Sequence, residues 1–325
     1  MTKSKPFVSI ILSFRNEENV IPEIIKRLKF SLSQSSISGY EIIFVNDDSS
    51  DKSQQLILNE ININKNKEIV LVNLSRRFGV YEGVYAGLEV SKGDVCIYMD
   101  CDLQDPPELI PKMIDKWLND EEAEVVFTTR NKRLGESAIK MYFTKLGYKI
   151  LKKISNIEIP ENSGDFKLLS RKIVNLLLEN QERLPFIKGL VPYYGFKQLQ
   201  LHYNREPRYD GKENTKFPFF SFSVFDNFFQ RVLISFTDIP LKFILITGFI
   251  ISFISLFYIL IVLIQKFLDM SLPGWSAIMA ATLLIGGIQL SLTGVIGLYV
   301  SVIFREVKKR PNYIIKSINR GKDVK

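Results

Sequence analysis

Short apolar runs alternate with longer amphipathic stretches over the first 130 residues of the chain. The runs are rich in β-branched residues and almost continuously hydrophobic, which is typical of strands covered on both faces. They lie at residues 7–14, 40–46, 68–74, 94–99 and 124–128. Helical periodicity marks the stretches between them, at residues 17–35, 51–61, 80–91 and 107–118. This alternation predicts an α/β domain on an open, mostly parallel sheet with helices on both sides.

Polar residues gather directly after three of these runs. The clusters are Asn16-Glu17-Glu18, Asp47-Asp48-Ser49 and Asp100-Cys101-Asp102. In open α/β sheets, ligands bind beyond the carboxyl ends of the strands. Acidic residues at three predicted strand ends therefore indicate a site at that edge of the sheet.

Two long apolar stretches occupy the C-terminal third of the chain, at residues 243–264 and 277–300. About 20 apolar residues suffice for a helix to cross a bilayer. Gly287, Ser291 and Gly294 lie at helical spacing in the second stretch, which favours close packing of two helices. We therefore expect a membrane-spanning hairpin, and the alternative is the buried hairpin of a soluble protein.

Two amphipathic stretches precede this hairpin. Residues 138–154 carry an apolar face with lysines over much of the rest, and residues 222–236 place phenylalanines at helical spacing. Basic amphipathic helices of this kind lie at membrane surfaces. For residues 138–154, packing on the chain's own domain with solvated lysines is an equal alternative. For residues 222–236, which adjoin the first span, we expect an interfacial helix.

The distribution of charge predicts an orientation. The net charge is +8, and residues 305–325 hold eight Lys and Arg against Glu306 and Asp323. A basic flank after the second span places the tail and the N-terminal domain in the cytoplasm. Basic residues concentrated beside membrane segments argue against a nucleic-acid partner. The charged N-terminus predicts no signal peptide, and Cys96 and Cys101, the only cysteines, form no disulfide framework and fit a reducing compartment.

The third polar cluster has the chemistry of a metal site. Asp100 and Asp102 flank one residue, so at a strand end both carboxylates can project toward one ion. Gln104 can add a third oxygen. Oxygen ligands favour Mg²⁺ or Mn²⁺ bound jointly with substrate phosphates. His202 is the only histidine, which argues against a zinc site.

Several segments resemble a known family. The strings are SIILSFRNEENV, EIIFVNDDSSD, LSRRFGVYEGVYAGL, VCIYMDCDLQDPPEL, SGDFKLLSR and LVPYYGFK. They are similar to segments of the polyprenyl-phosphate glycosyltransferases of glycosyltransferase family two, which include dolichyl-phosphate mannose synthases and bacterial bactoprenol glucosyltransferases. The resemblance covers residues 7–310, and the two apolar stretches match the bacterial branch. It implies a GT-A type nucleotide-sugar domain.

The resemblance also implies roles for individual residues. Asp47 resembles the carboxylate that holds the nucleobase, and Glu17 the residue beside the nucleotide. Asp100, Asp102 and Gln104 resemble the metal ligands, and Asp165 resembles the acidic residue proposed as catalytic base. By the same resemblance Arg76, Asp100 and Lys216 serve the nucleotide sugar, Arg130, Arg133, Arg205 and Arg208 gather the phosphates, and Asp102, Arg130 and Arg205 act in catalysis with Asp165. Arginine suits such a role because its planar fork meets phosphate oxygens bidentately.

The sequence departs from the family pattern near the donor. Asp48 stands where glycine is usual, and Val80 replaces the lysine that commonly follows the Phe-Gly pair. The loop expected near the donor phosphates reads Asn214-Thr215-Lys216-Phe217. These departures leave the metal ligands intact but leave the donor base and the sugar open.

The implied organisation has four parts. They are a cytoplasmic catalytic domain at residues 1–216, an interfacial helix at 217–240, a transmembrane hairpin at 241–304 and a basic cytoplasmic tail at 305–325. Relatives of the bacterial branch assemble as tetramers, so the resemblance implies a homo-oligomer in the cytoplasmic membrane.

The reaction implied is inverting transfer of a sugar from a nucleotide diphosphate to undecaprenyl or another polyprenyl phosphate. UDP-glucose is the first expectation, with N-acetylglucosamine, aminoarabinose and mannose as alternative sugars. A phosphate oxygen is already anionic at neutral pH, so we expect Asp165 to orient a substrate rather than to deprotonate one.

A different class of function, a catalytically silent membrane adaptor that binds nucleotide, is the remaining alternative. A processive polysaccharide synthase would need more spans and a Gln-x-x-Arg-Trp motif, which the sequence lacks.

Overall fold

The computed structural model describes residues 3–63, 67–130, 163–180, 182, 186–211, 239–268 and 274–321. The chain divides into two compact units, one of residues 1–217 with 311–325 and one of residues 218–310. The first unit thus combines chain segments from before and after the second.

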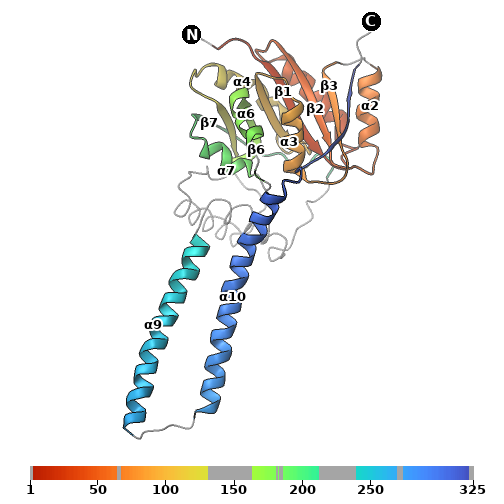
Figure 1. Ribbon diagram of the computed structural model, residues 1–325. Coiled ribbons are helices and arrows are strands. Elements are labelled where there is room, and N and C mark those ends of the chain that lie inside the picture. The colour runs from red at the N-terminus through yellow and green to blue at the C-terminus, as the bar shows by residue number, and fades with distance from the viewer. Residues whose placement is uncertain are drawn as a thin grey trace. The chain divides into compact units, whose positions relative to one another are not determined.

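A sheet of eight strands forms the centre of the first unit (Figure 1). The strands are β1 (Phe7–Phe14), β2 (Gly39–Asn46), β3 (Ile69–Leu74), β4 (Val95–Asp100), β5 (Val125–Arg130), β6 (Ser163–Ser170), β7 (Gln198–Tyr203) and β8 (Ile315–Arg320). Their order is β7-β5-β6-β4-β1-β2-β3-β8. Only β6 and β8 run antiparallel to their neighbours. The predicted α/β class with a mostly parallel sheet is confirmed.

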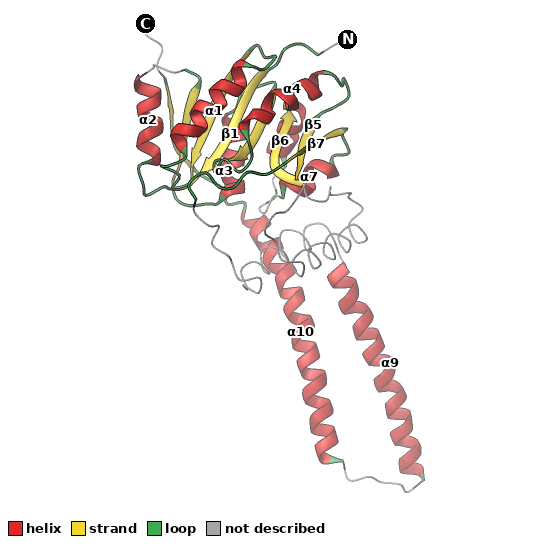
Figure 2. Ribbon diagram, turned by 180° about the vertical axis from the view of Figure 1, so that it is seen from behind, coloured by secondary structure: helices red, strands yellow, loops and turns green. Residues whose placement is uncertain are grey.

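Helices cover both faces of this sheet. They are α1 (Ile21–Ser33), α2 (Ser53–Ile63), α3 (Val80–Val90), α4 (Ile110–Leu118) after the 3-10 turn η1 (Pro107–Leu109), α6 (Arg171–Glu179) and α7 (Ile187–Tyr193). Helices α3 and α6 lie in front of the sheet in Figure 1. Helices α1 and α4 lie in front of it in Figure 2, which shows the molecule from behind. Pro22 stands in the first turn of α1, where a missing N–H costs nothing.

The main hydrophobic core lies between the sheet and α1, α2 and α4. Ile24 and Leu28 of α1 and Trp117 of α4 pack there with strand residues such as Phe44 and Phe166. Helix α3 packs on the other face of the sheet. A side chain on Gly83 would collide with Ser13 of β1, so this helix rests directly on the strand that leads to the predicted site.

The five predicted strands and the four predicted helices of the first 130 residues are all present, with ends shifted by a few residues. Strands β6 and β7 and helices α6 and α7 were not predicted, because the apolar pattern weakens beyond residue 130. Both cysteines are free and buried.

The C-terminal segment differs from the expected tail. Helix α10 ends at Lys308, and residues 315–320 form β8, which pairs with β3. Asn73 donates from Nδ2 to Ser317 Oγ at 3.1 Å and to Asn319 Oδ1 at 3.3 Å. Asn46 donates from Nδ2 to Asn73 Oδ1 at 3.0 Å. A ladder of polar side chains therefore ties the C-terminal segment to β3 and β2.

The second unit consists of the long helices α9 (Ile239–Phe267) and α10 (Trp275–Lys308). Their most apolar parts, Leu241–Tyr258 and Leu284–Lys308, have mean hydropathies of 2.1 and 1.8. Large apolar side chains are exposed on both, with Phe253 73% and Leu290 76% accessible. By length and composition both helices could cross a membrane, and the crossing itself stays a prediction.

Some predictions fall outside the described residues. They concern the amphipathic stretches 138–154 and 222–236, together with Arg133 and Lys216.

Candidate active site

The strand directions bring the predicted site residues to one edge of the sheet. Strands β1 and β2 end side by side at Phe14 and Asn46, and β4 ends beside them at Asp100. Strand β5 runs in the same sense and ends at Arg130. Because β6 runs the opposite way, its first residues, including Asp165, lie at this same edge.

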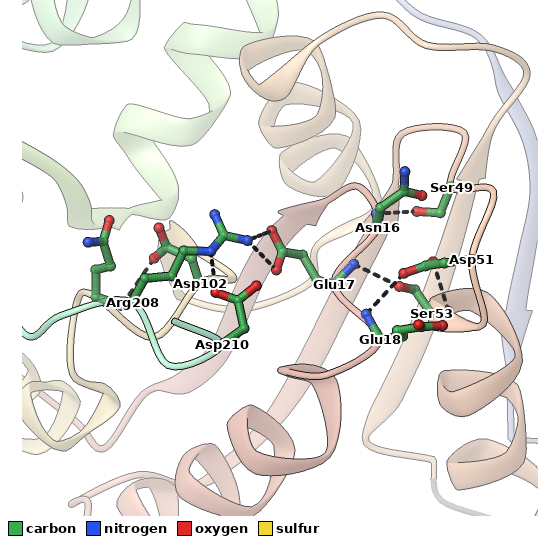
Figure 3. Close-up of polar contacts among 10 residues, drawn as sticks. Asn16, Glu17, Glu18, Ser49, Asp51, Ser53, Asp102, Arg208 and Asp210 are labelled. Atoms are coloured by element: carbon green, nitrogen blue, oxygen red, sulfur yellow. Dashed lines mark hydrogen bonds and ion pairs between the residues drawn. The ribbon is translucent and has the colours of Figure 1, made fainter. Parts of the chain in front are cut away.

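Hydrogen bonds join the loop after β1 to the loop after β2 (Figure 3). The backbone N–H groups of Asn16, Glu17 and Glu18 donate to Ser49 Oγ, Ser53 Oγ and Asp51 Oδ2 at 3.1, 2.9 and 3.1 Å. Ser50 donates its N–H to Asn16 Oδ1 at 2.8 Å in return. Side chains thus satisfy these loop amides, and Glu17 projects from a loop that these hydrogen bonds tie to its neighbour.

Left-handed backbone conformations recur in these loops. Asn16, Asp48 and Leu103 have φ angles of 57°, 59° and 59°. Asn and Asp adopt this region at small cost, which explains how Asp48 occupies a position where the resembling family has glycine. Leu103 has no such advantage, and its buried side chain holds the turn between Asp102 and Gln104.

Asp47 organises the loop after β3. Its Oδ1 accepts the N–H of Phe78 at 2.6 Å, and its Oδ2 accepts the N–H of Gly79 at 3.0 Å. Gly79 has φ 127°, a backbone conformation that glycine adopts readily and other residues rarely adopt. In this structure both oxygens of Asp47 are therefore engaged by backbone, and its predicted contact with a nucleobase stays a prediction.

A pocket of about 200 Å³ opens at this edge. Its lining residues are Ser13, Phe14, Arg15, Glu17, Asp47, Val80, Asp100, Cys101, Asp102 and Arg208. Small-molecule pockets usually measure about 300–1,000 Å³, so this one matches part of a nucleotide sugar rather than the whole. Five residues predicted from the sequence, Glu17, Asp47, Asp100, Asp102 and Arg208, line one cavity.

Negative charge is concentrated in the lining of this pocket, which includes Glu17, Asp47, Asp100 and Asp102. Burial, followed by the charges of Asp165 and Asp102, raises the pKa of Asp100 to about 7. Burial likewise raises the pKa of Asp102. Carboxylates crowded in this way are stabilised by a cation placed between them.

The ligand set fits a hard divalent cation. Gln104 Oε1 is buried and accepts no hydrogen bond within the described part of the chain. Among the described residues, no group of three or more His, Cys, Asp and Glu could hold a metal. Two carboxylates and an amide oxygen, completed by water and substrate phosphates, are what Mg²⁺ commonly uses.

Glu17 and Arg208, which both line the pocket, form an ion pair (Figure 3). Arg208 Nη2 lies 2.6 and 2.7 Å from the two Glu17 oxygens, and its Nε donates to Asp210 Oδ1 at 2.7 Å. Despite this partner, burial raises the pKa of Glu17. The pair ties the loop after β7 to the loop after β1. Arg208 is engaged by two carboxylates here, and its predicted contact with a phosphate stays a prediction.

Asp165 is also paired. Lys188 of α7 places Nζ 2.9 Å from Asp165 Oδ2. Asp165 Oδ1 is buried and has no hydrogen-bond partner among the described residues. Lys167, two residues along β6, is 3% exposed. Burial, and then the charge of Lys188, lowers its pKa to about 8.

The sequence profile of glycosyl transferase family 2 matches residues 9–178, which include most of β1, all of β2 to β6 and the acidic edge. The chain belongs to glycosyl transferase family 2. With the mixed, mostly parallel sheet, this membership confirms the predicted GT-A type fold, and the protein is a glycosyltransferase.

Relatives from this family extend over nearly the whole chain. An uncharacterized glycosyltransferase of Synechocystis sp. is 38% identical over 312 residues, which is 96% of this chain and 95% of the relative. The prophage bactoprenol glucosyl transferase homolog of Escherichia coli K12 is 32% identical over 96% of this chain and 99% of the relative. The bactoprenol glucosyl transferase of Shigella phage SfII is 32% identical over 97% and 99%.

Solved structures with similar folds are more distant. A mannosyltransferase of Pyrobaculum calidifontis, in complex with GDP-Man and Mn²⁺, is 16% identical over 94% of this chain and 88% of that one, with a TM-score of 0.44.

Three further predicted residues, Arg76, Arg130 and Arg205, are not among those that line the pocket. Arg76 is exposed and stacks on Phe78 at 4.2 Å from the ring centre. Arg130 and Arg205 lie at ion-pair distance from Asp105, which is fully buried. Asp105 was not predicted, although it lies in the acidic string that carried the resemblance.

Lys188 was not predicted either. Nothing in the sequence around it indicates its partner, because Asp165 lies on a different element and the two meet only in the folded sheet.

Proposed function

We propose that this glycosyltransferase transfers a sugar from a nucleoside diphosphate to a polyprenyl phosphate at the cytoplasmic face of a membrane. The observation that carries the proposal is the acidic pocket at the carboxyl edge of the sheet. Two helices long and apolar enough to cross a membrane, in the same chain, support a lipid acceptor. Relatives named bactoprenol glucosyl transferase that match over 96–97% of the chain support it further.

We assign the nucleotide-sugar donor to this pocket. Asp100, Asp102 and Gln104 would hold Mg²⁺ or Mn²⁺, which when bound neutralises charge on the departing diphosphate. Glu17 and Asp47 fix the loops that form the nucleotide side of the pocket. The surplus of carboxylates in its lining excludes an unaccompanied diphosphate by like-charge repulsion.

The acceptor end needs little proton transfer. An oxygen of the polyprenyl phosphate attacks the anomeric carbon, and the bond from that carbon to the nucleoside diphosphate breaks. This single displacement inverts the anomeric centre. The nucleophile is already an anion, so the Asp165 carboxylate, held by Lys188, suits a role in orienting substrate groups. Arg130 and Arg205 stabilise the phosphate charge.

UDP-glucose and undecaprenyl phosphate are the substrates proposed first. The relatives named glucosyl transferases support glucose, and N-acetylglucosamine, aminoarabinose and mannose are the competing sugars. A homo-oligomer, tetrameric by resemblance, belongs to the same proposal.

The test uses the full-length protein in detergent micelles with Mn²⁺ or Mg²⁺, undecaprenyl phosphate and a panel of UDP- and GDP-sugars. Mass spectrometry follows a lipid-linked sugar. We expect a product with one donor that is lost on chelation and in Asp102→Ala, and retained in the matched surface variant Asp120→Ala. Asp120 is a suitable control because it lies outside the pocket lining and pairs with Lys197, whose side chain is 45% exposed. Nucleotide binding without product from any donor would contradict the proposal and favour a silent adaptor.

A further inference from the structure

We infer that Asp105 and Tyr203 form a buried anchor that positions Arg130 and Arg205 for a substrate phosphate. The inference rests on the proposed function, because it assigns the arginines to a phosphate of the acceptor or the donor. Asp105 would be a positioning residue: it acts through the arginines and touches no substrate.

The anchor is built where two neighbouring strands end. Strands β5 and β7 are parallel, and Arg130 pairs in register with Tyr203 at their carboxyl ends. Asp105 comes from the loop after β4 and is fully buried between them. The Tyr203 hydroxyl donates a hydrogen bond to Asp105 Oδ1 and accepts one from Arg130 Nε at 3.2 Å.

A single carboxylate oxygen holds both arginines. Arg130 Nη2 lies 3.9 Å and Arg205 Nε 3.7 Å from Asp105 Oδ1. These are ion-pair distances, too long for hydrogen bonds, so the attraction orients the guanidinium groups without using up their N–H donors. The arginine side chains remain 23% and 27% exposed, whereas that of Asp105 is 0% exposed.

The positive and negative charges of the cluster of Asp105, Arg130 and Arg205 do not balance. Two guanidinium groups face the one carboxylate of Asp105, so these three groups together carry about one unit of net positive charge. Two arginine forks held side by side match the oxygens of a phosphate. Without Asp105, the two cations would repel each other at close range and lose their common orientation.

The loop that carries Arg205 is fixed by further contacts. The backbone N–H of Glu206 donates to Gln104 O at 3.0 Å. Arg27 of α1 bridges Glu108 at 2.6 Å and Glu206 at 3.3 Å. The segments 104–108 and 205–208 are therefore held together on both sides of Asp105, so the arginine positions follow from a built structure rather than from a loose loop.

The test compares Asp105→Asn, Tyr203→Phe and the surface control Asp120→Asn in the full-length protein in detergent micelles. Asparagine can still accept the Tyr203 hydrogen bond, so Asp105→Asn removes charge with little change of shape. Initial rates are measured while undecaprenyl phosphate, nucleotide sugar and Mn²⁺ are varied in turn. Native mass spectrometry measures binding of undecaprenyl phosphate and compares it with binding of undecaprenol, which lacks the phosphate.

We expect Asp105→Asn to raise the KM of one phosphate-bearing substrate about tenfold or more, because the two arginines lose the charge that orients them. The affected substrate identifies the source of the phosphate: undecaprenyl phosphate for the acceptor, nucleotide sugar for the donor. Tyr203→Phe should move the same KM less, and Asp120→Asn should move none. If the acceptor is affected, binding of undecaprenyl phosphate should fall while that of undecaprenol does not.

Three results would overturn the inference. Unchanged KM values with a reduced kcat would show a general structural role, and tighter phosphate binding would show that Asp105 repels the substrate. A shift in the Mn²⁺ requirement alone would make Asp105 a metal ligand. If the wild type forms no lipid-linked sugar, the proposed function fails, and the binding measurement still tests whether Asp105 supports phosphate recognition.

Discussion

The contact between Lys188 and Asp165 decides what the Asp165 carboxylate can do. At 2.9 Å, with both side chains only about a quarter exposed, the pair keeps one carboxylate oxygen occupied. We expect Lys188→Met to lower kcat about tenfold to a hundredfold, since a charge-assisted hydrogen bond contributes about 1.5–3 kcal/mol. Lys188→Arg should retain more activity, because it keeps a donor. Steady-state rates of lipid-linked sugar formation measure both.

A matched control for Lys188 is Lys172→Met, whose lysine is 57% exposed in its pairing with Glu124. It should leave kcat unchanged. Asp165→Asn completes the comparison. If it keeps most of the turnover, Asp165 is a positioning group, whereas a loss of several orders of magnitude that follows a titrating group would identify a base.

Lys167 makes stability depend on pH. Its pKa falls from 10.5 to about 8, mainly through burial. Below pH 8 the folded and unfolded chains both carry the proton, so the cost of burying the charge is fully present. Between pH 8 and 10.5 the folded protein releases the proton first, and stability rises with pH. Lys167→Met should therefore raise the stability at pH 7, on the order of 1–3 kcal/mol.

The measurement is a series of thermal melts of wild type and variant from pH 7 to 10.5. The difference between their melting temperatures should shrink as the pH rises, because the wild-type lysine becomes neutral. A difference that stays constant with pH would show that folding does not lower the pKa of Lys167, because the folded and unfolded chains would then bind the same number of protons.

At the scale of elements, β8 closes an edge that would otherwise be open. Fragment 1–217 lacks β8, so it exposes the edge of β3 and removes both acceptors of Asn73 Nδ2, Ser317 and Asn319. We expect it to melt lower and to self-associate, compared with a fragment in which residues 311–321 are joined on by a flexible linker. Each hydrogen bond lost with β8 contributes about 0.5–1.5 kcal/mol to stability. Calorimetry and size-exclusion chromatography provide the comparison.

Asn319→Ala in the full-length protein is the milder control, because it removes one acceptor and keeps the strand. Equal melting temperatures and a monomeric state for both fragments would show that β8 is dispensable for the first unit.

Strands whose side chains all enter the core could be predicted from the sequence. Strands that divide their side chains between the core and the site could not. Strands such as β1 are buried on both faces, so an uninterrupted apolar run marks them. In β6, Phe166 and Leu168 enter the core while Asp165 and Lys167 alternate with them. Because polar site residues alternate with apolar ones, the sequence of β6 shows no continuous apolar run, and the strand could not be predicted from it. The polar β8 becomes a strand because β3 offers a free edge, which no local pattern records.

The same limit applies to the candidate site. Glu17, Asp47, Asp100 and Asp102 could be predicted because each follows an apolar strand, and they line one pocket. The Asp105 and Lys188 contacts could not, since their partners lie 23 to 100 residues away and meet only through the strand order β7-β5-β6-β4.

For the whole molecule, the chain order links the two units covalently at both ends. The catalytic sheet is complete only after α9 and α10 have been made, because its last strand follows them. The relatives match nearly all of this chain, so their alignment spans both the glycosyltransferase unit and the two long helices. A glycosyltransferase whose sheet requires the segment beyond the hairpin needs both ends of that hairpin on the same side of any membrane it crosses.

That requirement can be tested by cysteine labelling, since the native Cys96 and Cys101 are 0% and 3% exposed and should give little background. We expect Ser271→Cys, between the two helices, to react with a membrane-impermeant maleimide in intact cells. Lys322→Cys, near the C-terminus, should react only after lysis, as the basic flank predicts. The reverse pattern would overturn the orientation. Labelling of both positions only after lysis would show that the helices do not cross the membrane.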